Sequence, residues 1–278
     1  FYKQSHTKRY KMDHIKSLVN RRVNVESQLK PFLFPVEERS VAFEDYPNEF
    51  FAESTLIKTE KYKSIVRSDN NRLMSIMPNT YKVVSNKEVV LPVIDFLDRF
   101  DNKWVVDPSH SFVQDGRMRL QITFPELIVN DGESDIALSL FIHNSYNGME
   151  GVRGFWGGIR GICTNGMVFG KLLGSFYSKH TSGINLEKFQ TQLEETTSKL
   201  PIIEERINIL KNIEVNSKML EDVEHKLGKS AMAYVHSNFD PTQSQYILLN
   251  VLTHYVSHNL RRHVRANYQR QISNIFNI

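Results

Sequence analysis

Three apolar runs separated by short turn-forming segments constrain the fold more than any other feature of this chain. Residues 117–129 alternate apolar and polar side chains, and residues 135–143 and 152–163 follow as further strand candidates. Asp115-Gly116 and Asn130-Asp131-Gly132, which bound these runs, favour tight hairpin turns. Because strands joined by such short turns run antiparallel, the sequence predicts a central antiparallel β-meander.

Helical spacing of apolar residues dominates the second half of the chain. We expect helices within residues 86–100, 167–177, 186–210, 216–227 and 241–278, the last as one or two helices. Pro201 either begins a second helix or kinks a long one, because an interior proline removes a hydrogen bond. The fold class is therefore α+β, with a central antiparallel β-meander and a mainly helical C-terminal half.

The remaining segments complete the predicted organisation. Residues 31–79 carry several prolines and aromatic residues, so short irregular elements over a core are expected there, and residues 81–84 are expected to form a strand. We predict a basic N-terminal arm at residues 1–30, an α+β core with the antiparallel sheet at residues 31–178, and a helical region packing on that core at residues 179–278.

Positive charge is concentrated at both ends of the chain. Residues 1–30 hold eight Lys or Arg against two acidic residues, and residues 228–278 hold five against Asp240, although the net charge is only +4. Such segregation is typical of proteins that bind nucleic acid or an anionic surface. The single Cys163 excludes an internal disulfide, and neither a leader nor a run of about 20 apolar residues is present, so we expect a cytoplasmic protein without a membrane partner.

Residues 142–170 combine eight glycines with amide and arginine side chains. This composition suits binding of a polyanion, and it equally suits a structural hairpin with solvated arginines. On strand 152–163, alternation places Arg153 and Phe155 on one face and Trp156 and Arg160 on the other. Arg153, Trp156, Arg160 and the nearby Lys171 are candidate nucleic-acid-binding residues, because arginines contact phosphates and rings stack on bases.

The last predicted helix presents a second basic surface. His254, His258, Arg261 and Arg265 would share one face of an unbroken helix, with Arg262 beside them. Phosphate contacts from Arg261, Arg262 and Arg265 are one interpretation, and a solvated face that pairs with the acidic middle helices is the other.

An enzymatic site is the alternative to a binding site. Its candidate residues form a polar set around the end of the glycine-rich segment: Asn144, Asn147, Arg160, Cys163, Asn165 and His180. No cofactor or metal is expected, because the spacing of His254 and His258 lacks a third ligand and no nucleotide-binding glycine motif occurs.

Several ordered motifs resemble one bacterial protein family. They are TYKVVSNKEVVLPVIDFLDRF, DGRMRLQITFPE, HNSYNGMEGVRG, IRGICTNG, the KHT at residues 179–181 and LLNVLTHYVSH. Together they resemble the domain of unknown function 932 family, which is carried by phages, prophages and plasmids, over roughly residues 72–270. The resemblance implies a mobile-element setting in a bacterial host. The predicted meander followed by a helix is also similar in outline to Rad52-like annealing proteins.

We therefore predict sequence-independent binding of single-stranded DNA, with strand annealing by a homo-oligomer in recombination or replication of a mobile element. An enzyme of unknown reaction that uses Asn144, Arg160, Cys163 and His180 is one alternative. A host-interaction or anti-defence protein is another, and it needs neither DNA nor catalysis.

Overall fold

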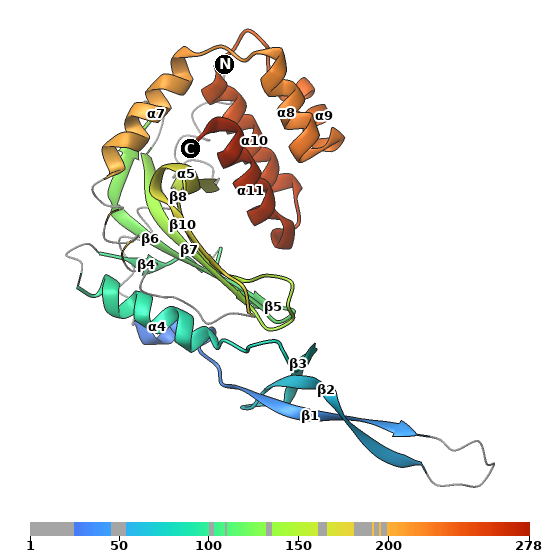
Figure 1. Ribbon diagram of the computed structural model, residues 1–278. Coiled ribbons are helices and arrows are strands. Elements are labelled where there is room, and N and C mark those ends of the chain that lie inside the picture. Colours follow the sequence, from blue (N-terminus) through green and yellow to red (C-terminus); the bar gives the residue numbers. More distant parts are fainter. Residues whose placement is uncertain are drawn as a thin grey trace, which may run out of the picture.

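Two antiparallel sheets and a C-terminal group of helices make up the structure, a computed structural model (Figure 1). The structure describes residues 25–45, 54–99, 103–108, 110–131, 135–160, 166–180, 191, 195 and 199–278. The predicted α+β class is confirmed. Most of the predicted basic arm, residues 1–24, lies outside the described residues.

The central sheet has the strand order β10-β8-β7-β6-β4, with β5 also paired to β6 and β9 to β8. Its strands are β4 (Val105–Val106), β5 (Phe112–Gln114), β6 (Arg117–Asn130), β7 (Asp135–Ser145), β8 (Val152–Arg160), β9 (Gly166–Val168) and β10 (Ser175–Ser178). All of the pairs are antiparallel, so the meander β6-β7-β8 is confirmed. Asp115 and Gly116 both have positive φ, as the tight turn between β5 and β6 requires.

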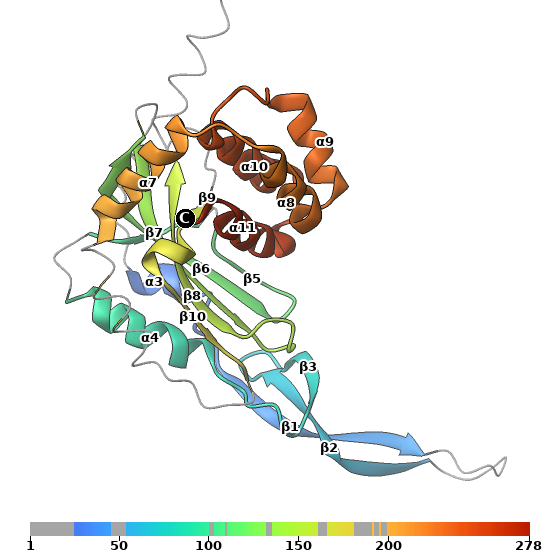
Figure 2. The same ribbon diagram turned by 45° about the horizontal axis from the view of Figure 1, so that its top comes forward.

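The central sheet has one apolar and one polar face, because side chains alternate along each strand. Leu120, Ile142 and Gly154 occupy neighbouring positions on the apolar face, where α4 (Asn86–Leu97) packs. Arg119, His143 and Arg153 occupy neighbouring positions on the polar face. In both views, α4 and α11 (Arg262–Phe276) lie on opposite sides of this sheet (Figures 1 and 2).

Helix α4 begins as its sequence predicts. The Ser85 side chain accepts a hydrogen bond from the Glu88 amide, and the Glu88 carboxylate accepts one from the Ser85 amide, which completes a capping box. Its Val89, Val90 and Val93 are buried, so the predicted helix at residues 86–100 is confirmed with a slightly earlier end.

A three-stranded sheet stands where short irregular elements were expected. It consists of β1 (Val36–Asp45), β2 (Thr55–Arg67) and β3 (Arg72–Pro78), preceded by the short helix α3 (Val25–Leu29). The β1–β2 hairpin projects away from the rest of the molecule (Figure 1). The expectation was wrong because most of β1 is exposed on both faces, so the strand carries no apolar alternation.

The C-terminal helices are α7 (Leu200–Asn212), α8 (Ser217–Leu227), α9 (Lys229–Asn238), α10 (Gln245–Asn259) and α11. Pro201 lies in the first turn of α7 and thus begins a helix. Helix α8 confirms the helix predicted at residues 216–227; Asn216 caps its start, and Gly228 is its C-cap. Residues 241–278 form two helices, because the chain is extended at Leu260 and Arg261.

Two further predictions were wrong. Residues 167–177 do not form one helix: the chain passes through β9, the short α5 (Gly170–Leu173) and β10, and Gly174 at φ 90° separates the last two. Residues 81–84 form a loop without strand pairing. None of the described helices has the length and apolar character needed to cross a bilayer.

Candidate nucleic-acid interface

A groove of about 490 Å³ lies between the polar face of the central sheet and α11. We call it the α11 groove. Its lining includes His143, Arg153, Phe155, Tyr177, Arg270 and Asn274. Because β7, β8 and β10 supply one wall and α11 the other, the groove joins the glycine-rich segment to the end of the chain.

A smaller cavity of about 60 Å³ continues the α11 groove, since His143 and Ala266 line both. Arg119 and Gln121 of β6 and Arg265 of α11 belong to this smaller cavity. The Gln121 side chain is fully buried, and its Oε1 has no hydrogen-bond partner among the described residues. Guanidinium groups and an open amide acceptor therefore extend the polar lining.

One carboxylate lies among these cations. Glu150 Oε1 is 2.6 Å from Arg119 Nη2, and Glu150 Oε2 is 3.6 Å from His143 Nδ1. Burial lowers the pKa of His143 well below its usual value, and the charges of Arg119 and Arg153 lower it further. His143 is therefore neutral near pH 7, and positive charge in the α11 groove comes from arginines.

Arg153 is held against an aromatic ring. Its guanidinium carbon is 4.8 Å from the centre of the Tyr177 ring, and its buried Nε has no hydrogen-bond partner among the described residues. Across the groove, Arg270 Nη2 donates to Asn267 Oδ1 at 2.8 Å. Because an unsatisfied buried donor is costly, the arrangement around Arg153 favours an anionic or acceptor group as ligand.

The structure brings together only part of the predicted interface. Arg153 lines the α11 groove and Arg265 lines the adjoining cavity, whereas exposed Arg261 lines neither. Trp156 is only 4% exposed, and the centre of its ring lies 5.7 Å from that of Phe124 on the apolar face. It therefore offers no surface to a base. The side chains of Arg160, Lys171 and Arg262 lie outside the described part of the structure.

The predicted basic stripe from His254 to Arg265 is not continuous. The turn at Leu260 separates His254 and His258 of α10 from Arg265 of α11. The Tyr234 hydroxyl and His254 Nδ1 are 2.9 Å apart, so His254 takes part in helix packing. Among the described residues, no group of three or more His, Cys, Asp or Glu is arranged to hold a metal ion.

Those residues of the enzymatic alternative whose side chains the structure describes, Asn144, Asn147 and His180, do not line this groove. Asn144 Nδ2 donates to Val84 O and to Asn86 Oδ1, both at 2.9 Å, which joins β7 to the start of α4. The ring of His180 stacks on Tyr81. Asn147 Nδ2 donates to Asp115 O in the turn between β5 and β6, and Asn147 Oδ1 accepts from the Met149 amide. Cys163 and Asn165 lie outside the described residues.

Sequence reasoning missed Arg119, His143, Glu150 and Arg270 as members of one site. Alternation along residues 117–123 already places Arg119 and Gln121 on one face of β6. Only the register shows that Arg119 lies opposite His143, and His143 opposite Arg153.

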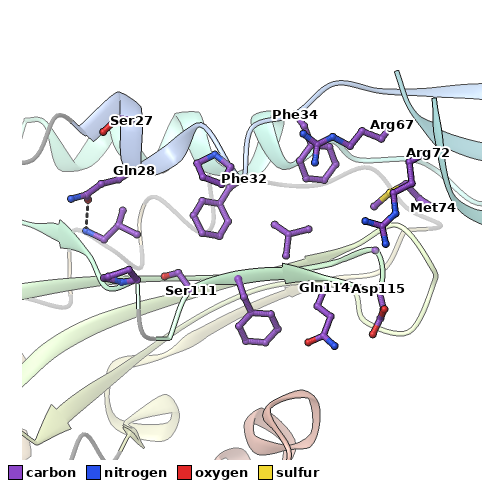
Figure 3. Close-up of a pocket in the computed structure, with 16 residues that line it drawn as sticks. Ser27, Gln28, Phe32, Phe34, Arg67, Arg72, Met74, Ser111, Gln114 and Asp115 are labelled. Carbon is purple, nitrogen blue, oxygen red and sulfur yellow. Dashed lines mark hydrogen bonds between the residues drawn. The ribbon is translucent and has the colours of Figure 1, made fainter. Parts of the chain in front are cut away.

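A second cavity, of about 730 Å³, lies between the segment that joins α3 to β1 and the strand β5 (Figure 3). We call it the α3 slot. Phe32, Phe34 and Met74 give it apolar walls, and Arg67 and Arg72 lie at one end, near Asp115 (Figure 3).

A protein-family model described as a domain of unknown function (DUF932) matches residues 74–275. The chain belongs to this family. The DUF932 match begins within β3 and ends within α11, so it includes every strand of the central sheet and both walls of the α11 groove. No curated protein and no solved structure matches the chain, and the outline similarity to Rad52-like proteins finds no support there.

Proposed function

We propose that this protein binds single-stranded DNA, without sequence preference, in the α11 groove. The observation that carries the proposal is that Arg153 of β8 and Arg270 of α11 line one groove together with the rings of Phe155 and Tyr177. Arginines attract the phosphate backbone, and aromatic rings accept any base, because every base has a stacking face.

The charge balance of the groove supports a polyanionic ligand. Arg119 is paired with Glu150, whereas Arg153 and Arg270 have no carboxylate partner among the described ion pairs. Each phosphate contact to a single strand lowers the slope of log affinity against log salt by about 0.7. We therefore expect weak, strongly salt-dependent binding that changes little with base sequence.

The test is fluorescence anisotropy with labelled oligonucleotides across a salt series. Wild-type protein should bind oligo(dT) and mixed sequences with similar affinity at low salt, and less well as salt rises. Arg270→Glu and Arg153→Gln should each weaken binding about tenfold, the loss expected for one desolvated contact. Arg99→Glu, an exposed change at the end of α4, is the matched control.

Two outcomes would reject the proposal. One is no detectable binding by a correctly folded wild-type protein at low ionic strength. The other is binding that Arg270→Glu and Arg153→Gln weaken no more than Arg99→Glu does, because the α11 groove would then not be the binding surface.

We further propose that the protein acts as a homo-oligomer that anneals strands during recombination or replication of a phage or plasmid, in the bacterial cytoplasm. Two observations support this extension. The family resemblance implies a mobile-element setting, and the projecting β1–β2 hairpin exposes Phe43 and Ile57 on one face and Leu56 on the other. Exposed apolar clusters of this kind are typical of protein–protein contacts.

A further inference from the structure

We propose that the α3 slot binds the nucleotides adjoining those in the α11 groove, with one base stacked on Arg67 and one phosphate on Arg72. This inference rests on the proposed function, and it adds the course of the strand and a second contact region. A DNA strand on this course would leave the polar face of the central sheet and turn around β5.

The cavities adjoin one another along this course. The small cavity beside the α11 groove and the α3 slot share Phe112, which lies on β5. β5 pairs with β6 at the side of the central sheet away from β8 and β10. It therefore forms an edge of the sheet around which a DNA strand can bend. The α11 groove, the small cavity and the α3 slot thus follow one another, with only β5 between the last two.

Arg67 is held as a flat surface at one end of the slot. Its Nε and Nη2 donate to the two carboxylate oxygens of Asp69 at 2.7 and 2.8 Å, and its guanidinium carbon lies 4.2 Å from the centre of the Phe34 ring. The bidentate bond fixes the plane, and Phe34 supports one side of it. A planar guanidinium fixed in this way is a good stacking surface for an unpaired base.

Arg72 supplies the positive charge for the proposed phosphate contact in the α3 slot. Its side chain is exposed and lines the slot at the same end as Arg67 (Figure 3). Of the carboxylates at this end, Asp69 is bound by Arg67, and Asp115 Oδ2 is 4.0 Å from Arg117 Nη2. Arg72 has no ion-pair partner among the described residues, so this end of the slot keeps an excess positive charge.

The remainder of the slot suits bases rather than phosphates. Phe32 and Phe34 are buried in its wall, and Met74 and Val113 line it as well. Ser27, Gln28 and Ser111 are the polar residues farther along, and Gln28 Oε1 already accepts a hydrogen bond from the Val106 amide. Apolar walls with charge at one end resemble the alternation of ring and cation that single-strand binders use.

The experiment compares oligonucleotides of about 5 and about 15 nucleotides, near the ends of the range of sites known for single-strand binders. Wild-type protein should bind the longer oligonucleotide more tightly than the shorter one, and by more than its larger number of possible binding positions explains. Arg72→Glu should weaken binding of the longer oligonucleotide about tenfold and reduce its salt slope by about 0.7, while the shorter one changes less than about twofold. Arg99→Glu is again the control.

Arg67→Lys separates stacking from charge, because lysine keeps the charge and loses the plane. We expect weaker binding of the longer oligonucleotide with an unchanged salt slope, at a melting temperature that confirms folding. Equal effects of Arg72→Glu on both lengths, or no effect on either, would overturn the inference and leave the α11 groove intact. Failure of the proposed function itself is distinct, because wild-type protein would then bind neither oligonucleotide.

Discussion

Arg119 and Glu150 form an ion pair, with 2.6 Å between Arg119 Nη2 and Glu150 Oε1, on the polar face of the central sheet. Both side chains are largely buried. The pair neutralises one arginine beside the α11 groove and leaves Glu150 Oε2 without a hydrogen-bond partner among the described residues. Glu150 therefore opposes the binding of any anion at this site.

Glu150→Gln removes this negative charge while keeping the shape of the side chain. Under the proposed function, affinity for single-stranded DNA at low salt should rise about fivefold, because a nearby like charge is lost. Unfolding by urea should show a loss of about 1–3 kcal/mol, as expected for a weakened buried charge pair. Glu224→Gln on α8 is the exposed control, and a fall in affinity for Glu150→Gln would contradict the charge argument.

Asn144→Ala tests whether Asn144 is structural or catalytic. The change removes the bonds to Val84 O and Asn86 Oδ1 from a fully buried position. We expect the free energy of unfolding to fall by about 2–3 kcal/mol, since one buried and one half-buried acceptor are left unsatisfied. Oligonucleotide affinity at a temperature where the variant is folded should stay unchanged. Loss of an enzymatic turnover without loss of stability would favour the enzymatic alternative.

The protein should become less stable as the pH falls below about 6.5. Burial lowers the pKa of both His143 and His180 in the folded state. The unfolded chain therefore binds more protons, so the stabilisation is fully present above the unfolded histidine pKa of about 6.5 and is lost as the pH falls towards the folded values. Melting temperatures between about pH 8 and pH 5 measure this, and the double variant His143→Gln, His180→Gln should flatten the curve. A double variant whose melting temperature changes with pH in the same way as that of wild-type protein would contradict the prediction.

Gly157→Ala should destabilise the central sheet. A Cβ at this position would collide with the Met167 carbonyl on β9 and with the Phe141 ring, and the backbone carbonyl has little freedom to move. We expect a loss of about 2–3 kcal/mol from overpacking. Gly228→Ala is the comparison, because its Cβ meets open space and only its φ of 85° opposes a side chain. That variant should lose about 1 kcal/mol, and equal losses in the two variants would argue against a steric origin.

The β1–β2 hairpin should mediate self-association if the protein is an oligomer. Phe43 and Ile57 are paired across the two strands and are 53% and 41% exposed. Changing both to Lys should shift the sedimentation coefficient from that of an oligomer to that of a monomer. The stability of each folded chain should change by less than about 0.5 kcal/mol, as is usual for exposed positions. If wild-type protein sediments as a monomer, the β1–β2 hairpin does not mediate self-association.

The central meander and helices α4 and α8 could be predicted because their local signals agree. Alternation in β6 coincides with flanking turns, and the helical spacing of apolar residues in α4 and α8 agrees with the caps that the structure shows at Ser85 and Asn216. The β1–β2 hairpin escaped prediction because cross-strand pairing rather than burial forms it. Residues 167–177 escaped because Gly174 interrupts what composition alone presents as one helix.

Part of the candidate site could be predicted and part depends on the fold. Alternation on β8 correctly placed Arg153 and Phe155 on the face opposite Trp156. The break at Leu260 redirected the final helix, so Arg270 rather than Arg261 reaches the groove. Neither this turn nor the register that aligns Arg119 with His143 is encoded by local spacing.

The position of Trp156 gives the protein an internal optical probe. The chain has two tryptophans, and Trp156 lies one residue from Phe155 but on the opposite face of β8. Its indole is shielded from solvent and from anything seated in the α11 groove. In a Trp104→Phe variant, a change in the emission of Trp156 on adding a ligand would therefore report a rearrangement transmitted through the sheet, whereas constant emission would mean that the sheet acts as a rigid platform.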